Sequence, residues 1–158
     1  MHVVRSAIPS LILALAVVAG LAVAGVPVCA AAVTPDPAGS PYDAATTREL
    51  QTLITKQLDA FNRADAPAAE SFATPQFRDK YPDPATFFAM VKENYAPLFK
   101  PRSTHFEDIS DSPHGPLQKM TVVAADGTVW TAVYIFERIS GEWRISGCGL
   151  MKQDGQDI

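Results

Sequence analysis

The sequence predicts an α+β domain in which N-terminal helices pack in a curved, mainly antiparallel sheet of four or more strands. Up to about residue 95, apolar residues recur at steps of three and four, the period of a helix that presents one face to a core. From about residue 102 the period changes to the alternation of strands, with turn residues between the segments. Helices that precede an antiparallel run of strands collect on one face of the sheet, which defines the α+β class.

The first predicted helix covers residues 44–63. Asp43 precedes it and can cap its first turn, because a short acidic side chain accepts hydrogen bonds from free backbone N–H groups. Its apolar residues fall on one stripe: Leu50, Leu53, Ile54, Leu58 and Phe61. This stripe predicts that one side of the helix faces a core.

Two shorter helices are expected next. A cap followed by a proline, at residues 65–67, opens a short helix that carries Phe72. We expect a turn that holds Phe77 and Tyr81 after it. The same signature of a cap and a proline then opens a third helix over residues 85–95.

Four strands are predicted in the second half of the chain, at residues 104–109, 117–125, 128–139 and 143–150. Asp126 and Gly127 predict a two-residue hairpin turn, because such turns need a positive φ that glycine adopts freely. Ser140 and Gly141 predict the next turn. The strands therefore form a meander.

The longest predicted strand, residues 128–139, is apolar on both of its faces. Successive side chains alternate across a sheet, which gives two sets: Val129, Val133 and Ile135 on one side, and Trp130, Ala132, Tyr134 and Phe136 on the other. The helices can cover one face, and the other requires a partner subunit, more chain, or curling of the sheet on itself. The strand pattern leaves open which set faces the helices.

The N-terminal residues 1–31 have the three parts of a secretory signal peptide. Arg5 gives a positive start, residues 8–24 are almost wholly apolar, and small residues follow at 30–32. We expect cleavage at these alanines and a periplasmic or extracellular mature protein. An uncleaved membrane anchor is the alternative, since about 17 to 25 apolar residues can span a bilayer. A glycine and a proline just before the alanines favour cleavage.

The rest of the chain divides into a flexible proline-rich linker at 32–42, a single domain at 43–152 and a polar tail at 153–158. The whole chain has 13 Lys and Arg against 17 Asp and Glu, and loss of Arg5 with the signal peptide leaves 12 against 17, a net charge of −5. Nucleic-acid binding needs a dense basic surface and is therefore not expected. After cleavage, only Cys148 remains of the two cysteines, so no disulfide within the chain is expected.

Short segments of the sequence resemble a known superfamily. Residues 60–65 (AFNRAD) at the end of the first helix and 141–145 (GEWRI) near the end of the meander are similar to the nuclear-transport-factor-2-like (NTF2-like, cystatin-like) superfamily. Residues 87–91, 126–130 and 143–148 resemble, more narrowly, a bacterial domain-of-unknown-function family of small exported proteins, DUF4864. The resemblance implies a cone-shaped sheet that encloses a pocket, and it carries no activity over, because the superfamily includes enzymes and plain binding modules alike.

Within such a cone, the pocket candidates are Phe61, Tyr95, Trp130, Tyr134 and Cys148. Acid–base chemistry would fall to His105 or Tyr134, since the superfamily's enzymes place such a group in the pocket or at its rim. His105 and His114 lie near acidic residues, but their spacing matches no metal signature, so neither a metal nor a cofactor is expected.

The sequence thus favours an exported, non-catalytic domain that binds a small apolar ligand, its own copy, or both. A homodimer would use the outer face of the last three strands. The alternative is a lyase or isomerase that acts on a small molecule with His105 or Tyr134 as the acid–base group. A module that binds an envelope protein is a third possibility. We expect no nucleic-acid partner and no membrane contact after signal cleavage.

Overall fold

Helices followed by an antiparallel meander form the domain, as the sequence predicts. The structure, a computed structural model, describes residues 39–153. Its elements are α1 (Ala44–Asn62), α2 (Ala66–Ser71), α3 (Pro75–Arg78), α4 (Pro84–Asn94), the 3-10 helix η1 (Ala96–Leu98), β1 (Ser103–Ser110), β2 (Leu117–Val123), β3 (Val129–Ile139) and β4 (Glu142–Lys152). The strands form one antiparallel sheet in the order β1-β2-β3-β4. The α+β prediction is confirmed.

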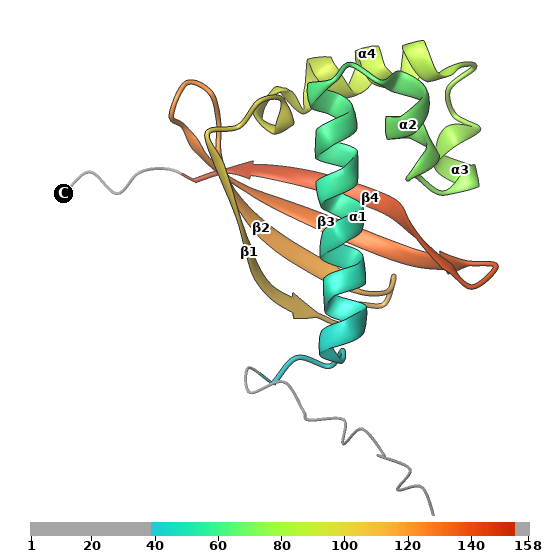
Figure 1. Ribbon diagram of the computed structural model, residues 1–158, viewed down its shortest axis with the longest axis vertical. Helices are drawn as coiled ribbons and strands as arrows, with labels where there is room; N and C mark the ends of the chain where they lie inside the picture. The colour runs from blue at the N-terminus through green and yellow to red at the C-terminus, as the bar shows by residue number, and fades with distance from the viewer. Residues whose placement is uncertain (1–38, 154–158) are drawn as a thin grey trace, which may run out of the picture. The chain divides into compact units, whose positions relative to one another are not determined.

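The helices lie on one face of this sheet. Figure 1 shows α1 crossing the face of the sheet, with α2, α3 and α4 gathered beside one end of α1. No helix among residues 39–153 is long and apolar enough to cross a membrane. The predicted signal peptide, most of the predicted linker and the tail beyond Gln153 lie outside the described residues.

Helix α1 is fixed at its start by a side-chain cap and along its length by burial. Asp43 accepts a hydrogen bond from the Thr46 backbone N–H at 2.7 Å, which satisfies one of the free N–H groups of the first turn. The side chains that face the core are Leu50, Ile54, Gln57, Leu58, Ala60 and Phe61. One polar residue, Gln57, therefore lies within the apolar stripe.

The region between α2 and α4 differs from the prediction. A turn was expected around Phe77, whereas residues Pro75–Arg78 form the short helix α3, which Thr74 precedes and Pro75 starts. Phe72 follows the last residue of α2 and does not lie within it. The physical reason is packing, because Phe77 contacts the rings of Tyr81 and Phe87 at centroid distances of 5.8 and 6.0 Å.

The register of β3 decides which of its faces is inward. Ala132, Tyr134 and Phe136 are fully buried against the helices. Val133 and Ile135 alternate with them and are half-buried on the outer face. The structure thus answers the question that the sequence left open, because the even-numbered residues of β3 face the helices.

The two hairpins of the last three strands use different turns. Between β2 and β3, the Gly127 N–H donates to Ala124 O at 2.9 Å, and Ala124 N–H donates to Thr128 O at 2.8 Å. This closes a three-residue loop with Gly127 at φ 92°, so the predicted two-residue turn was wrong. Between β3 and β4, Ser140 and Gly141 have φ of 51° and 87° and form a two-residue turn, as predicted.

Replacing Gly115 by alanine is expected to lower the free energy of unfolding by at least about 2 kcal/mol, because the change combines strain with a clash. Gly115 has φ 106°, and a Cβ there would lie 2.3 Å from the Phe136 carbonyl oxygen. Gly141→Ala is the matched control, because Gly141 has φ 87° and no atom within 4 Å of an added Cβ. The decrease in the free energy of unfolding caused by Gly141→Ala should stay at about 1 kcal/mol. Urea denaturation measures both variants, and equal losses would contradict the role of the contact.

Candidate functional site

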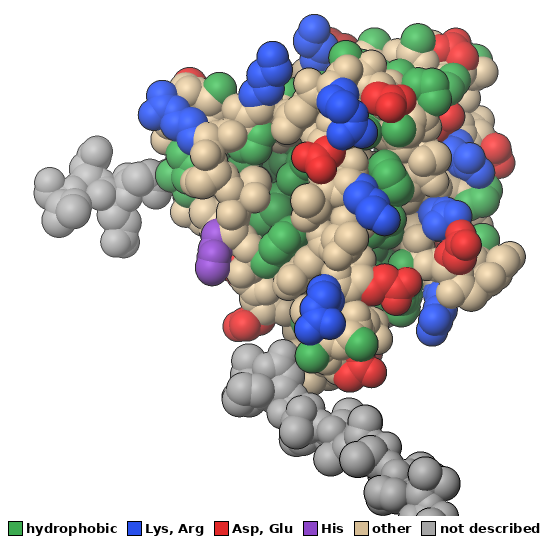
Figure 2. Space-filling view, in the orientation of Figure 1, with side chains coloured by type: hydrophobic (Ala, Val, Ile, Leu, Met, Phe, Trp, Pro, Cys, Tyr) green, Lys and Arg blue, Asp and Glu red, His purple; other side chains and the backbone are tan. Residues whose placement is uncertain are grey.

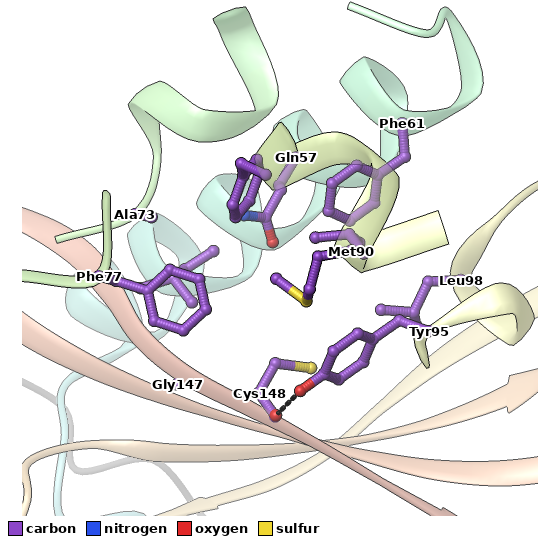
Figure 3. Close-up of a pocket in the computed structure, with 12 residues that line it drawn as sticks. Gln57, Phe61, Ala73, Phe77, Met90, Tyr95, Leu98, Gly147 and Cys148 are labelled. Atoms are coloured by element: carbon purple, nitrogen blue, oxygen red, sulfur yellow. Dashed lines mark hydrogen bonds between the residues drawn. The ribbon is translucent and has the colours of Figure 1, made fainter. Parts of the chain in front are cut away.

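A small pocket lies between α1, α4 and β4. Its volume is about 40 Å³. The side chains and backbone that line it come from seven parts of the fold: Gln57, Phe61, Ala73, Phe77, Phe87, Met90, Val91, Tyr95, Leu98, Ile145, Gly147 and Cys148. Figure 3 shows the Met90 thioether and the Cys148 side chain on opposite sides of this space. Most of the lining is therefore apolar, with a few polar atoms.

The chain closes one side of the pocket by pairing a loop with β4. The Thr74 N–H donates to Ile145 O at 3.0 Å, and the Ile145 N–H donates to Phe72 O at 2.8 Å. The register of β4 against β3 shifts between Ile145 and Gly147, where Ser146 is the extra residue of a β-bulge. These contacts hold the segment before α3 on the sheet, so the short helices form a wall of the pocket.

Tyr95 and Cys148 meet on the β4 side of the pocket. The Tyr95 hydroxyl donates to the Cys148 carbonyl oxygen at 2.9 Å, and Figure 3 shows this bond. Burial raises the pKa of the Cys148 thiol from 9.0 to about 12. Burial also raises the pKa of Tyr95. Both groups are therefore neutral near pH 7, and Cys148 lacks the thiolate that a nucleophile needs.

Tyr134 on β3 pairs with Cys148 on β4 and does not line the pocket. It is fully buried, and its hydroxyl has no hydrogen-bond partner among residues 39–153. The Cys148 thiol lies beside this hydroxyl and interacts with it, without reaching the geometry of a hydrogen bond. Burial raises the pKa of Tyr134 well above its ordinary value. The hydroxyl is thus a neutral, unpaired donor in the core.

Tyr134→Phe is expected to raise the free energy of unfolding by roughly 1 kcal/mol, because an unpaired buried hydroxyl opposes folding. Tyr95→Phe is the control and should lower it by about the same amount, since it removes a made hydrogen bond. Thermal and urea unfolding measure both variants. A loss of stability in Tyr134→Phe would show that the hydroxyl has a partner.

Gln57 supplies a further polar group to the pocket. Its Nε2 donates to the Ala69 carbonyl oxygen at 3.4 Å. Its Oε1 accepts no hydrogen bond from any residue between 39 and 153, and Figure 3 shows this oxygen directed into the pocket. The sequence analysis missed Gln57. The available signal was its place in the apolar stripe of α1, between Ile54 and Phe61.

The structure brings some of the predicted residues together and separates others. Phe61, Tyr95 and Cys148 line the pocket. Trp130 does not, because it lies toward the other end of β3, where its Nε1 donates to Thr128 Oγ1 at 2.8 Å. Met90 and Phe77, which the sequence did not indicate as pocket residues, are also part of the lining.

Both candidate histidines lie away from the pocket. His105 is exposed on β1 and pairs with Thr121, which places its side chain on the outer face of the sheet. His114 is exposed in the loop between β1 and β2. Within residues 39–153 no group of three or more His, Cys, Asp or Glu side chains could hold a metal ion.

A second hollow runs between α1 and the β3–β4 turn. Its volume is about 530 Å³, and its lining includes Arg48, Glu49, Lys56, Glu142 and Arg144. Arg144 forms an ion pair with Glu142. Figure 2 shows the same mixture of acidic and basic side chains over this side of the molecule. A groove with both signs of charge selects no charged ligand, and the exposed ion pair contributes little stability.

A helix that crosses the inner face of an antiparallel meander, with a pocket at one end, defines the domain as an α+β domain. The chain belongs to the family described as "Domain of unknown function (DUF4864)", whose profile matches residues 43–158. Among curated proteins, none matches the chain.

Two solved structures are similar to the chain. One is an NTF-2-like protein of unknown function from Silicibacter pomeroyi DSS-3, with 15% identity over 69% of this chain and 97% of that chain, at a TM-score of 0.48. The other is an NTF-2-like protein of unknown function from Burkholderia xenovorans LB400. Its identity is 12%, over 71% of this chain and 88% of that chain, at a TM-score of 0.43.

Proposed function

We propose that the domain is a non-catalytic binding module that holds a small apolar molecule in the pocket between α1, α4 and β4. One observation carries this proposal: the lining is predominantly apolar and contains no group that is ionised near pH 7. Concave apolar sites with a few polar groups are the usual form of small-molecule sites. The pocket has this form on a small scale.

The positions of the acid–base candidates support binding over catalysis. A lyase or isomerase needs a titratable group that reaches the substrate, with a pKa near the working pH. His105 lies on the opposite face of the sheet, and Tyr134 is fully buried, does not line the pocket and has a raised pKa. Neither acid–base candidate therefore has the position that an acid–base enzyme requires.

The size of the pocket limits what it holds. A volume of about 40 Å³ accommodates a few non-hydrogen atoms. Met90 is the adaptable part of the lining, because methionine is unbranched and changes rotamer at small cost. A larger ligand therefore requires Met90 to move or has to extend out of the pocket.

Xenon is a suitable first probe, because this single apolar atom enters dry cavities. Amide resonances of Gly147 and Cys148 should shift in xenon-saturated buffer, and resonances on α1 outside the pocket should not. Met90→Ala enlarges the pocket and should let toluene produce the same shifts. If neither probe shifts the pocket amides in either protein, the proposed binding function is wrong.

Self-association is a second candidate, and the outer face of the sheet favours it. Half-buried apolar side chains, with the exposed Met151, form this face: Leu117, Val123, Val129, Val133, Ile135 and Met151. Met151 is 57% exposed, and no element among residues 39–153 covers these side chains. A second copy of the chain would bury them, because a flat apolar sheet face is complementary to itself.

Light scattering of the purified protein at tens of micromolar should then give the mass of a dimer. Val133→Lys places a charge in the centre of the outer face and should give a monomer. Thr52→Lys adds the same charge on the exposed side of α1 and should leave the dimer intact. A functional dimer should form at concentrations on the order of 100 micromolar or below. A wild-type protein that remains monomeric at that concentration would rule out this interface.

Export is the third part of the proposal and rests on the N-terminal sequence pattern. Mass spectrometry of the protein from the producing cell should find a mature chain that starts near Ala31. Recovery of intact chain from the membrane fraction, starting at Met1, would instead support the uncleaved anchor.

A further inference from the structure

The polar atoms that face the pocket accept hydrogen bonds and do not donate strong ones. The Gln57 amide is oriented by the Ala69 carbonyl, which can only accept a hydrogen bond and so requires the Nε2 side of the amide. This orientation directs Oε1 into the pocket. The Gln57 contribution is therefore an acceptor without a partner among the described residues.

Tyr95 presents the same chemistry from the opposite wall. Its hydroxyl has a single hydrogen, and this hydrogen is donated to the Cys148 carbonyl oxygen at 2.9 Å. Only the lone pairs of the Tyr95 oxygen remain for a bound molecule. The Cys148 thiol also has a single hydrogen, which it directs at the Gly149 carbonyl oxygen at a sulfur–oxygen distance of 4.0 Å, and a thiol is a weak donor.

The lining also lacks any charge that could balance a charged ligand. None of its twelve residues is Lys, Arg, His, Asp or Glu. An ammonium or carboxylate group that left water for this pocket would lose its hydration without an opposite charge in return. The aromatic rings of Phe61, Phe77 and Phe87 could attract a cation, but this attraction is smaller than the cost of removing a charge from water without an opposite charge beside it.

We propose that the pocket selects a small neutral alcohol, whose hydroxyl donates to Gln57 Oε1 while its carbon atoms contact the aromatic rings and Met90. This inference rests on the proposed binding function and adds the chemical class of the ligand. A hydroxyl matches the site because it donates one hydrogen bond to an acceptor that has no partner among the described residues. Molecules that only accept hydrogen bonds would leave Gln57 Oε1 without a hydrogen-bond donor.

Two isomers separate this class from general apolar binding. 1-Butanol and methyl propyl ether have the same atoms and similar size, but only the alcohol donates a hydrogen bond. Titrations followed by the amide resonances of Gly147 and Cys148 should give an affinity for 1-butanol about tenfold higher than for the ether, the effect of one net hydrogen bond. Butylammonium and butanoate should bind more weakly than the ether.

Gln57→Leu tests the residue that makes the selection. It keeps the size of the side chain on α1 and should reduce the affinity for 1-butanol to that for the ether, with the ether unchanged. Gln51→Leu is the matched control, because Gln51 lies on α1 outside the pocket and donates to Gln118. It should keep the preference for the alcohol.

The outcomes distinguish the two levels of the proposal. Equal binding of 1-butanol and the ether to the wild-type protein overturns the alcohol class and leaves the apolar pocket standing. Tighter binding of butylammonium or butanoate also overturns the class. If none of the four compounds shifts the pocket amides and xenon does not either, the binding function itself fails. The wild-type comparison decides the class even if Gln57→Leu does not fold.

Discussion

Leu50→Ala is expected to lower the free energy of unfolding by about 3 to 5 kcal/mol. Leu50 is fully buried where α1 crosses the sheet, and the hydrophobic core around it is continuous. Removing its side chain loses the transfer free energy of the deleted groups and leaves a cavity, because the neighbouring helix and strands cannot close the space completely.

Leu53→Ala is the matched control for this prediction. Leu53 lies on the same helix, three residues further along, and is only half-buried. Leu53→Ala should lower the free energy of unfolding by about 1 kcal/mol. Urea denaturation measures both variants, with a lower midpoint and an unchanged slope as the sign of a pure stability effect. Similar losses at the two positions would mean that α1 does not pack on the sheet with the face described above.

Stability is also expected to decline steeply between pH 9 and pH 12. The pKa of Cys148 is about 12 in the folded protein, against 9.0 in its ordinary state, because burial disfavours the thiolate. Above pH 9 the unfolded chain releases this proton and the folded chain keeps it, so stability is full below pH 9 and is lost as the pH rises. One such group gives a slope of up to about 1.4 kcal/mol per pH unit.

Cys148→Ala isolates the contribution of the thiol. Between pH 9 and 10 the free energy of unfolding of this variant should stay nearly constant, while that of the wild type falls. Above pH 10 both proteins should lose stability, because the pKa values of Tyr42, Tyr95 and Tyr134 are also raised above 10.0. Urea unfolding at intervals of half a pH unit measures this difference. Parallel curves from pH 9 to 10 would show that the thiol is not buried.

The order of the elements could be predicted because the relevant signals are local. The residues of α1 are spaced so that Leu50, Ile54 and Phe61 share one face, and Asp43 caps the first turn. The alternation in residues 128–139 gave the long strand β3, whose two faces are both apolar. These patterns follow from the backbone periods of 3.6 and 2 residues, which act between neighbours in sequence.

Two of the errors in the fold occur where distant contacts decide the structure. Helix α3 has only four residues, too few to be stable alone, and the packing of Phe77 on Phe87 holds it. The loop before β3 has three residues instead of two, and its closing bond from Ala124 N–H to Thr128 O depends on the pairing of β2 with β3. Local turn chemistry could place Gly127 in a turn without fixing the length of the loop.

The candidate site was predictable only in part. Phe61, Tyr95 and Cys148 were chosen from the expected cone, and they line the pocket. The role of Gln57 depends on the Ala69 carbonyl, which belongs to the next helix and orients its amide. No pattern in the sequence of α1 contains that information, so the acceptor in the pocket became visible only in the folded chain.

By itself, the sequence determined the α+β order of elements, the acidic balance of charge and the cap of α1, because composition and period are properties of neighbouring residues. The tertiary structure decided which face of β3 is inward, that His105 lies on the opposite face of the sheet from the pocket, and that the Tyr134 hydroxyl has no hydrogen-bond partner in the described part of the chain. Burial and hydrogen bonding depend on residues far apart in the chain. Tyr95 and Cys148, 53 positions apart, form their bond only when α4 has packed beside β4.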